Sequence, residues 1–193
     1  MALVARVKGI LLTPKTEWGV IEPEPATVSS LYTGYIIPLA AIPVIAGFIG
    51  LTLIGYNVLG TTLRFSLGAG IQHAIVMYVM SLIGTFVLAL IIDALAPNFG
   101  GQKNQVQALK VAAYSSTASW VAGIFAILPA LSILSVLGLY SLYLLFLGLP
   151  RLMKVPEERA MLYTVVVVVG AIAVFILVNA VTKTVVPMPG LVL

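Results

Sequence analysis

The stretch Asp93-Ala-Leu-Ala-Pro97-Asn98-Phe99-Gly100-Gly101-Gln-Lys103-Asn104 is the polar, glycine-containing connection between two long apolar runs of this chain. It begins with an acid at the end of one run and leads to Lys110 and Tyr114 at the start of the next. Proline and paired glycines favour a tight reversal of the backbone. The stretch therefore predicts that the two runs form an antiparallel helical pair, closed by this turn at one end.

The composition predicts a membrane protein built from helices. Of the 193 residues, 61% are hydrophobic and 8% are charged, whereas a soluble domain has about 25% charged residues. Such a chain cannot cover itself with a surface compatible with water, so the bilayer must serve as its solvent. The predicted fold class is all-α, a polytopic membrane protein in which residues 31–193 form one membrane domain.

The residue types that are rare or missing exclude several kinds of chemistry. The chain has no cysteine, which excludes disulfides, thiolate nucleophiles and cysteine-bound metals, and it has one histidine. We therefore expect no metal, no cofactor and no catalytic set. The net charge of +4 comes from basic residues scattered at the ends of apolar runs, which argues against a nucleic-acid partner.

The apolar runs predict five membrane spans. Residues 74–92 would extend about 28 Å as a helix, enough to cross the bilayer once. The forty uncharged residues 111–150 would extend about 60 Å, so we expect the chain to reverse at Leu128-Pro129-Ala130. The predicted spans are residues 31–55, 70–93, 110–128, 130–149 and 161–182, and residues 56–69 are predicted to form a loop.

Two prolines, Pro38 and Pro43, lie within the first predicted span. Proline removes a backbone hydrogen bond, so this helix is expected to be kinked or partly unwound. Helix packing is one interpretation of such a kink, and a binding site is the alternative.

Residues 1–30 are predicted to form an interfacial region on the cytoplasmic side. As a helix, residues 1–12 would place Arg6 and Lys8 at the edges of one apolar face, which suits a helix lying in the membrane surface with its basic side chains reaching for phosphates. The apolar face comprises Leu3, Val4, Val7, Ile10 and Leu11.

A second short helix is expected to follow, with Thr13 as its cap and Pro14 at its first position. Trp18 is expected at the level of the lipid headgroups, where tryptophan is enriched. Pro14, Glu17 and Trp18 together form the candidate interfacial anchor.

The distribution of basic residues predicts the orientation of the chain. Eight Lys and Arg residues fall on the side of the N-terminus, and only Arg64 and Lys183 fall on the other. Positive residues accumulate in cytoplasmic loops, so we expect a cytoplasmic N-terminus and an external C-terminus in a bacterial inner membrane. All six acidic residues also lie on the cytoplasmic side.

The polar residues around the quoted stretch form the candidate functional cluster. An antiparallel pair would bring Asp93 close to Lys110, and Tyr114 follows on the same helical face. One interpretation is an ion pair that closes the hairpin, with glycines supplying positive backbone angles in the turn. The other is a polar site for a lipid headgroup, an ion or a protein partner. The cluster comprises Asp93, Pro97, Gly100, Gly101, Lys110 and Tyr114.

Several motifs of this chain resemble the bacterial branch of the Yip family, the Ypt/Rab-interacting membrane proteins. They include Leu11-Leu12-Thr13-Pro14-x-x-x-Trp18-x-x-Ile21, Asp93-x-x-x-Pro97-x-Phe99-Gly100-Gly101 and Ala108-x-Lys110-x-x-Ala113-Tyr114. Gly138-Leu-Tyr140-x-x-Tyr143 and Lys154-Val-Pro156-x-x-x-Ala160 are similar to the same group. The resemblance implies five membrane helices and a cytoplasmic N-terminal region. In eukaryotic members it implies a link to Rab GTPases, so a small-GTPase partner follows from resemblance alone.

Three functions from different classes fit the sequence. The leading hypothesis is a non-enzymatic scaffold or membrane-organising protein that acts through its cytoplasmic face on membrane lipids or partner proteins. The alternative is a small oligomeric transporter or channel for an ion or lipid that uses Asp93, Lys110 and Tyr114. A lipid-modifying enzyme that relies on Asp93 is the third. The sequence leaves open whether the chain has a membrane-protein partner or forms a homo-oligomer.

Overall fold

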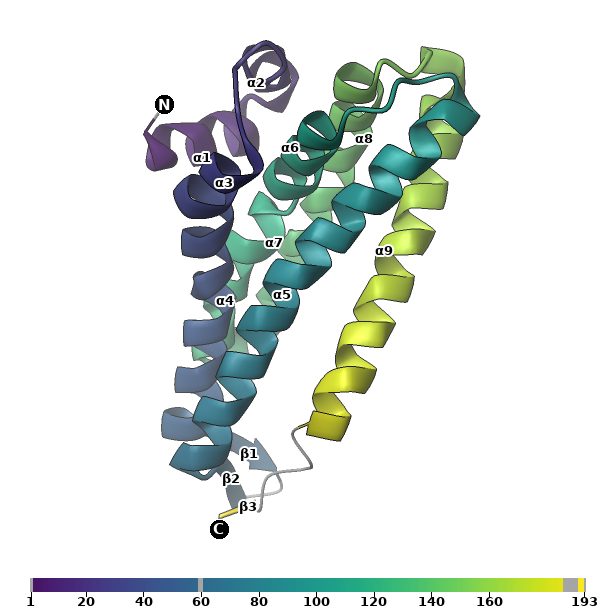
Figure 1. Ribbon diagram of the computed structural model, residues 1–193. Helices are drawn as coiled ribbons and strands as arrows, with labels where there is room; N and C mark the ends of the chain where they lie inside the picture. The colour runs from purple at the N-terminus through teal and green to yellow at the C-terminus, as the bar shows by residue number, and fades with distance from the viewer. Residues whose placement is uncertain (1, 59–60, 186–190, 193) are drawn as a thin grey trace.

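The computed structural model describes residues 2–58, 61–185 and 191–192, which form a bundle of long helices with a small sheet at one end (Figure 1). The two short N-terminal helices, α1 (Leu3–Leu12) and α2 (Pro14–Ile21), lie at the opposite end of the bundle from this sheet. The N-terminal region and Arg64 were expected on opposite sides of the membrane. They lie at opposite ends of the molecule, since Arg64 belongs to the sheet.

Among the described residues, four helical segments are long and apolar enough to cross a membrane, with mean hydropathies from 2.1 to 2.9. They are Val28–Ile54, Leu67–Phe99, Ala130–Met153 and Glu157–Thr182. The prediction of a helical, multi-pass membrane protein is confirmed at this level. The elements of these segments are α3 (Val28–Leu31), the π-helical η1 (Tyr32–Ile36), α4 (Ile37–Phe48), the π-helical η2 (Ile49–Ile54), α5 (Leu67–Leu95), the 3-10 helices η3 (Ala96–Phe99) and η5 (Pro129–Leu139), α8 (Tyr140–Met153) and α9 (Glu157–Val185).

The irregular turns of the first segment lie before and after its two prolines, and the prolines themselves are in regular α-helix. Helix α4 begins next to Pro38 and continues through Pro43. The widened π-helical turns lie before and after it, in η1 and η2. Such turns accommodate a helix whose hydrogen-bond ladder is disturbed, so the expected distortion is present but displaced along the chain.

The segment expected to be the third span, residues 110–128, is divided. It consists of α6 (Gln105–Ser115), α7 (Thr117–Ala122) and the 3-10 helix η4 (Gly123–Ile127), with a break at Ser116. Three hydroxyls at the break donate to main-chain oxygens of the preceding turn, which bends helices. They are Ser115 to Val111 (2.6 Å), Ser116 to Ala112 (2.7 Å) and Thr117 to Tyr114 (2.7 Å).

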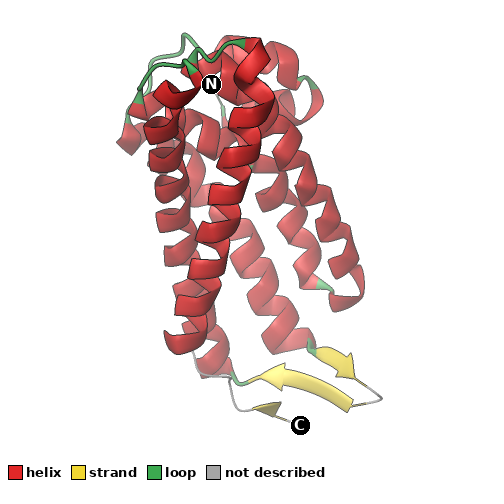
Figure 2. Cartoon of the chain, turned by 90° about the vertical axis from the view of Figure 1, so that its right-hand side faces the viewer, coloured by secondary structure: helices red, strands yellow, loops and turns green. Residues whose placement is uncertain are grey.

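The predicted loop at residues 56–69 contains strands. β1 (Tyr56–Val58) pairs antiparallel with β2 (Thr61–Phe65), and β2 pairs with β3 (Leu191–Val192) in the order β1-β2-β3 (Figure 2). Position 57 opposes position 62, and position 64 opposes position 192. The sheet therefore brings a C-terminal segment next to the connection between α4 and α5.

The tightly packed core lies at the end of the bundle that carries α1 and α2. Helix α5 packs against α4, α6 and α9, and α6 packs against α8. The largest fully buried side chains include Ile10, Trp18, Ile21, Ile92, Leu109, Leu144, Leu149, Met153 and Tyr163. Toward the sheet, side chains of α9 such as Phe175 (66% exposed) point outward, as expected for a surface that the bilayer covers.

Candidate functional site

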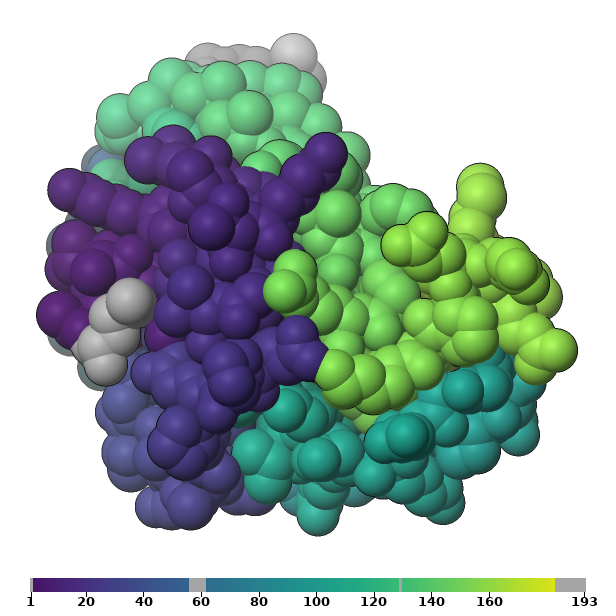
Figure 3. Space-filling view, turned by 90° about the horizontal axis from the view of Figure 1, so that it is seen from above, coloured from purple at the N-terminus to yellow at the C-terminus, as the bar shows by residue number. Residues whose placement is uncertain are grey.

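Residues 2–26, here called the N-terminal cap, lie against α6, α8 and the start of the first membrane segment. Seen from above, the cap covers one side of the molecule and meets residues of α8 (Figure 3). Tyr140 of α8 donates a 3.2 Å hydrogen bond to the main-chain oxygen of Leu11. The cap is thus part of the folded bundle, and its polar contacts form the candidate site.

Trp18 anchors the cap by packing inside the protein. Its side chain is 1% exposed, so it does not face the headgroups as expected. It lies on Gly148, where an added Cβ would be 2.6 Å from Trp18 Cζ2. Its ring also meets that of Tyr114 edge to face at 6.3 Å. The missing side chain of Gly148 therefore creates the space that the indole fills.

Arg6 is the charged centre of the cap. We expected Arg6 at the edge of the apolar face of α1, where its side chain would reach lipid phosphates, yet it is 3% exposed. Its Nη1 donates to Glu17 Oε1 at 2.5 Å, its Nη2 donates to Glu24 Oε2, and its guanidinium lies over the ring of Tyr114 at 5.6 Å. Buried charges require such partners. A signal was present in the sequence, since three basic residues, Arg6, Lys8 and Lys15, are followed by three glutamates within the first 24 positions.

Glu17 and Pro14 are therefore structural parts of the cap. Pro14 is buried at the first position of α2, as predicted. Thr13 does not cap this helix with its side chain, and its hydroxyl instead donates to Gly9 at 3.1 Å. The carboxylate of Glu17 lies beside Gly9, where an added Cβ would be 2.5 Å from Glu17 Cδ.

Lys110 joins the cap to α6. Its Nζ donates to the main-chain oxygens of Ile21 (2.9 Å), Glu22 (3.3 Å) and Glu24 (2.5 Å). These carbonyls lie at the end of α2 and just beyond it, where the helix dipole favours a cation. The expected ion pair between Asp93 and Lys110 is absent from the described part of the chain, because these three carbonyls use all three N–H donors of Lys110.

Asp93 belongs to a different environment. Its Oδ1 is buried and has no hydrogen-bond partner among the described residues. The neighbouring main-chain oxygen of Ile92 accepts a 2.6 Å hydrogen bond from Tyr163 of α9. The structure therefore separates Asp93 from Lys110 and Tyr114, which the sequence grouped with it.

The turn residues Pro97, Gly100 and Gly101 hold the connection against α8 and α9. Gly100 has φ +78° and closes the turn through a 3.1 Å bond from its N–H to Pro97. Gly101 has no positive φ and is needed for close approach, since an added Cβ would be 2.6 Å from the main-chain oxygen of Met153. The prediction of positive angles therefore holds for Gly100 alone.

Glu22 links the cap to the loop between α8 and α9. It accepts a 3.0 Å hydrogen bond from Arg151 Nε and another from Lys154 Nζ. Hydrogen bonds from Lys154 and then Arg151 hold the pKa of Glu22 below its ordinary value. The acidic residues of the cap thus pair with basic ones. Among the described residues, no three His, Asp or Glu side chains come together in a group that could hold a metal ion.

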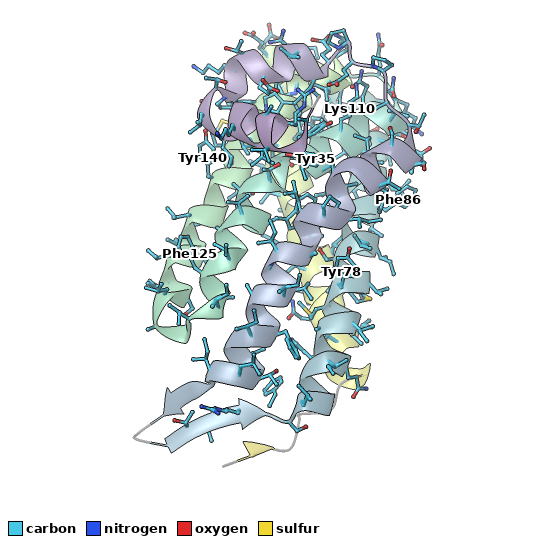
Figure 4. All side chains as sticks on the ribbon, turned by 90° about the vertical axis from the view of Figure 1, so that its left-hand side faces the viewer. Tyr35, Tyr78, Phe86, Lys110, Phe125 and Tyr140 are labelled. Atoms are coloured by element: carbon cyan, nitrogen blue, oxygen red, sulfur yellow. The ribbon has the colours of Figure 1, made fainter. Side chains whose placement is uncertain are left out.

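A cavity of about 220 Å³, here called the Arg6 cavity, lies between the cap, the first membrane segment and α6. Figure 4 shows Tyr35 and Lys110 together at this end of the molecule. Tyr35 donates to or accepts from Thr117 at 2.7 Å and stacks edgewise on Tyr114 at 4.6 Å. The polar side chains that line the cavity are Arg6, Glu24, Ser30, Tyr35, Lys110 and Tyr114.

The lining gives the Arg6 cavity a distinct chemistry. It contains two cations, Arg6 and Lys110, and the carboxylate of Glu24, and a second carboxylate, Glu17, binds Arg6 from outside the lining, so the charges of this group balance. The hydroxyl of Tyr114 has no hydrogen bond among the described residues, and three N–H groups of Arg6 remain beyond those given to glutamates. The cavity therefore offers donors to a small anionic or zwitterionic group.

Residues 8–178 match the family described as Yip1 domain. The chain is similar to Inner membrane protein YohC of Escherichia coli strain K12, with 34% identity over 125 residues that cover 64% of each chain. The protein of the same name from Escherichia coli O6:H1 strain CFT073 matches to the same extent. The matched region spans slightly less than two thirds of these relatives, and no solved structure matches.

Proposed function

This chain belongs to the Yip1 domain family, and from that premise we propose that it is a non-enzymatic, membrane-organising protein of the bacterial inner membrane that binds phospholipid headgroups in the Arg6 cavity. The name of the Escherichia coli relatives supports the inner membrane. The excess of basic residues at the cap end supports a cytoplasmic N-terminus and an external C-terminus.

The proposed topology has five membrane segments and an interfacial region at residues 1–30. Four of them are the segments of membrane length. The fifth is residues 105–127, in which the break at Ser116 shortens the continuous helix. The cap then lies at the cytoplasmic surface, where its cavity meets the headgroups of the inner leaflet.

The observation that carries the proposal is the pair of buried cations in one open polar cavity. Arg6 is 3% exposed and Lys110 is 2% exposed, yet both line the Arg6 cavity. Its volume of about 220 Å³ is several times the roughly 30 Å³ that one water occupies in the liquid. A phosphate would receive charge-assisted hydrogen bonds from Arg6 and a neutral one from the unpaired hydroxyl of Tyr114.

The outer face of the cap supports a lipid in preference to a protein as the ligand. Val4 (65% exposed) and Leu12 (78% exposed) point away from the bundle, and Lys8 and Lys15 are exposed beside them. Apolar and basic side chains together suit a helix at an anionic membrane surface. The cap would then touch lipid both with its outer face and through its cavity.

The test is lipid retention by the purified protein. The wild type, extracted in mild detergent, should carry phospholipid in native mass spectrometry and bind added phosphatidylglycerol in nanodiscs. Tyr114→Phe removes one hydroxyl and should weaken this binding about tenfold or more, because a hydrogen bond to a charged group contributes about 1.5–3 kcal/mol. Inorganic phosphate as a competitor distinguishes a lipid site from a site for the free anion.

Two matched variants control this experiment. Tyr143→Phe makes the same change in a tyrosine of α8 that is 39% exposed and does not line the Arg6 cavity. Lys103→Gln removes an exposed charge from the connection between η3 and α6, outside both the cap and the Arg6 cavity. The proposal fails if Tyr114→Phe binds lipid like the wild type, or if Tyr143→Phe weakens binding equally.

The alternative of a small oligomeric transporter draws support from one observation, the buried Oδ1 of Asp93, which has no hydrogen-bond partner in the described part of the chain. The group it requires is not assembled, because Lys110 and Tyr114 line the Arg6 cavity and Asp93 does not. Movement of an ion or lipid across vesicles by the purified protein, abolished by Asp93→Asn without loss of folding, would favour the transporter. A second copy or another membrane protein retained in native mass spectrometry would favour a scaffold for proteins.

A further inference from the structure

A groove between α8 and α9, here called the α8–α9 groove, consists of two neighbouring cavities that share Phe146 in their lining. The polar cavity, of about 640 Å³, lies at the connection between the two helices and is lined by Arg151 and Glu157. Figure 1 shows this connection at the cap end of the bundle. The apolar cavity, of about 370 Å³, continues along both helices. The groove shares no lining residue with the Arg6 cavity.

The groove follows one face of α9. Its lining residues from this helix begin at Glu157 and follow each other at alternating intervals of three positions and one, as far as Val169. This spacing marks a single stripe along an α-helix. The twelve steps from the first to the last extend about 18 Å, and one leaflet of the hydrocarbon core is about 15 Å thick. The groove therefore has the length of one leaflet and begins at its charged surface.

The apolar cavity is open to the side of the bundle. Four of its lining side chains are exposed, Phe146 (41%), Met161 (71%), Val165 (51%) and Val169 (61%). Helices α8 and α9 both belong to segments of membrane length, so the surroundings of these side chains are hydrocarbon. An acyl chain can enter the cavity from the bilayer without crossing a polar barrier.

The polar cavity presents one cation and one anion that do not pair with each other. The Nε of Arg151 donates to Glu22 at 3.0 Å, and its two Nη groups donate to no described residue. Glu157 forms no ion pair with any described residue. The cavity therefore matches a ligand group that carries a negative and a positive charge side by side.

Phosphatidylethanolamine has this pair of charges. Its phosphate accepts two parallel hydrogen bonds from a guanidinium group, and its ammonium group has three N–H donors for a carboxylate. Phosphatidylcholine has the same net charge but no N–H on its nitrogen, and phosphatidylglycerol has no cation. These two lipids therefore separate recognition of the ammonium group from simple attraction between charges.

We propose that the α8–α9 groove binds phosphatidylethanolamine, with the phosphate on Arg151, the ammonium group on Glu157 and an acyl chain along α9 as far as Val169. This is a second lipid site, beyond the one proposed in the Arg6 cavity, and neither site depends on residues of the other. Lipid is the occupant because the charged end and the apolar end of the groove are one leaflet apart.

The test compares lipids that differ in one group. Native mass spectrometry of the purified protein, titrated with each lipid, should show about tenfold tighter binding of phosphatidylethanolamine than of phosphatidylcholine, the effect of one charge-assisted hydrogen bond. Glu157→Gln should bind phosphatidylcholine like the wild type and lose this preference. Glu158→Gln is the matched control, because Glu158 lies in the same first turn of α9 and is exposed but does not line the groove.

Three results would overturn the headgroup assignment. They are equal affinities of the wild type for the two lipids, tighter binding of phosphatidylglycerol, and an equal loss of preference in Glu158→Gln. The Tyr114→Phe variant distinguishes this site from the Arg6 cavity: it should keep the preference for phosphatidylethanolamine. Loss of the preference in Tyr114→Phe would assign the preference to the Arg6 cavity and remove it from the groove.

Variants at the phosphate and along the chain complete the test. Arg151→Gln should weaken the binding of both lipids about tenfold, whereas Glu22→Gln, which removes the partner of Arg151 and keeps its charge, should not. Val165→Trp fills the apolar cavity and should reduce the retention of both lipids. Ile172→Trp is its control, since Ile172 is 52% exposed on α9 and lines neither cavity. Unchanged binding in Val165→Trp, or a dimer that binds no lipid there, would overturn lipid as the occupant.

Discussion

The Nζ of Lys110 lies 2.5 Å from the main-chain oxygen of Glu24, a residue 86 positions earlier in the chain. Together with the bonds to Ile21 and Glu22, this contact ties the end of α2 to α6. The ammonium group of Lys110, which was expected to pair with Asp93, thus binds main-chain carbonyls instead. The stability of the cap should depend on these hydrogen bonds.

We expect Lys110→Met to lower the stability of the protein. The substitution keeps most of the apolar stem but removes the Lys110 donor from three carbonyls, of which Ile21 and Glu22 keep another donor. A hydrogen bond to a charged group contributes about 1.5–3 kcal/mol, so the loss should be of this order. Thermal unfolding in detergent measures the loss. Lys103→Met, at an exposed position in the same connection, should change the midpoint little, and equal midpoints for the two variants would contradict this role of Lys110.

Asp93→Asn combined with Lys110→Met tests whether the two residues interact. Because Lys110 binds carbonyls and Asp93 Oδ1 has no described partner, the changes in stability should add within about 0.3–0.5 kcal/mol. Asp93→Asn alone should not destabilise the protein, since it removes an unpaired carboxylate from a partly buried position. If the double variant loses clearly less stability than the sum of the two single losses, Asp93 and Lys110 do form the ion pair that closes the hairpin.

The ion pairs of Glu22 predict a pH dependence of cap docking. Its pKa is lowered in the folded protein by Lys154 and Arg151, so its contribution is present above the ordinary pKa of 4.5 and is lost as the pH falls through the lower, folded-state pKa. The stability difference between the wild type and Glu22→Gln should therefore be greatest near neutral pH and shrink in acid. Unfolding midpoints of both proteins between about pH 7 and 3 give the comparison, and a difference independent of pH would refute it.

Gly148→Ala should displace the cap. The new Cβ would lie 2.6 Å from Trp18 Cζ2, and such overpacking costs about 1–3 kcal/mol. Amide hydrogen exchange in α1 and α2 should become faster. Gly47→Ala is the matched control, because no atom lies within 4 Å of its added Cβ, and its helix should be unchanged or slightly more stable. Unchanged exchange in Gly148→Ala would show that Trp18 moves without cost.

The long helices could be predicted from hydropathy, charge and turn residues. Apolar runs bounded by charges predicted three of the long segments to within a few residues, and Pro97 with Gly100 predicted the turn after Asp93. The divided segment at Ser116 was missed, because hydroxyl groups that bond to the preceding turn leave no change in hydropathy. The strands at Tyr56–Val58 and Thr61–Phe65 were missed for a related reason, since they are short and one of them pairs with the distant C-terminal strand.

The candidate site was predicted only in part, because its partners are distant in sequence. Lys110 and Tyr114 were singled out in the sequence as polar candidates, and both lie in α6 and line the Arg6 cavity. Their partners could not be predicted from the adjacent turn, since the cap that supplies Arg6 and Glu24 folds back over α6 from the N-terminus. An amphipathic pattern in residues 1–12 does not distinguish a helix that lies on lipid from one that lies on its own bundle.

The burial of Trp18 against Gly148 also gives the protein a spectroscopic reporter of its own. The chain has two tryptophans, and the other, Trp120, lies in α7. A protein with Trp120→Phe would emit from the cap alone, and one with Trp18→Phe would emit from the membrane region alone. Undocking of the cap would shift the emission of the first to longer wavelength and change that of the second less, so the cap and α7 can be followed separately in the same lipid.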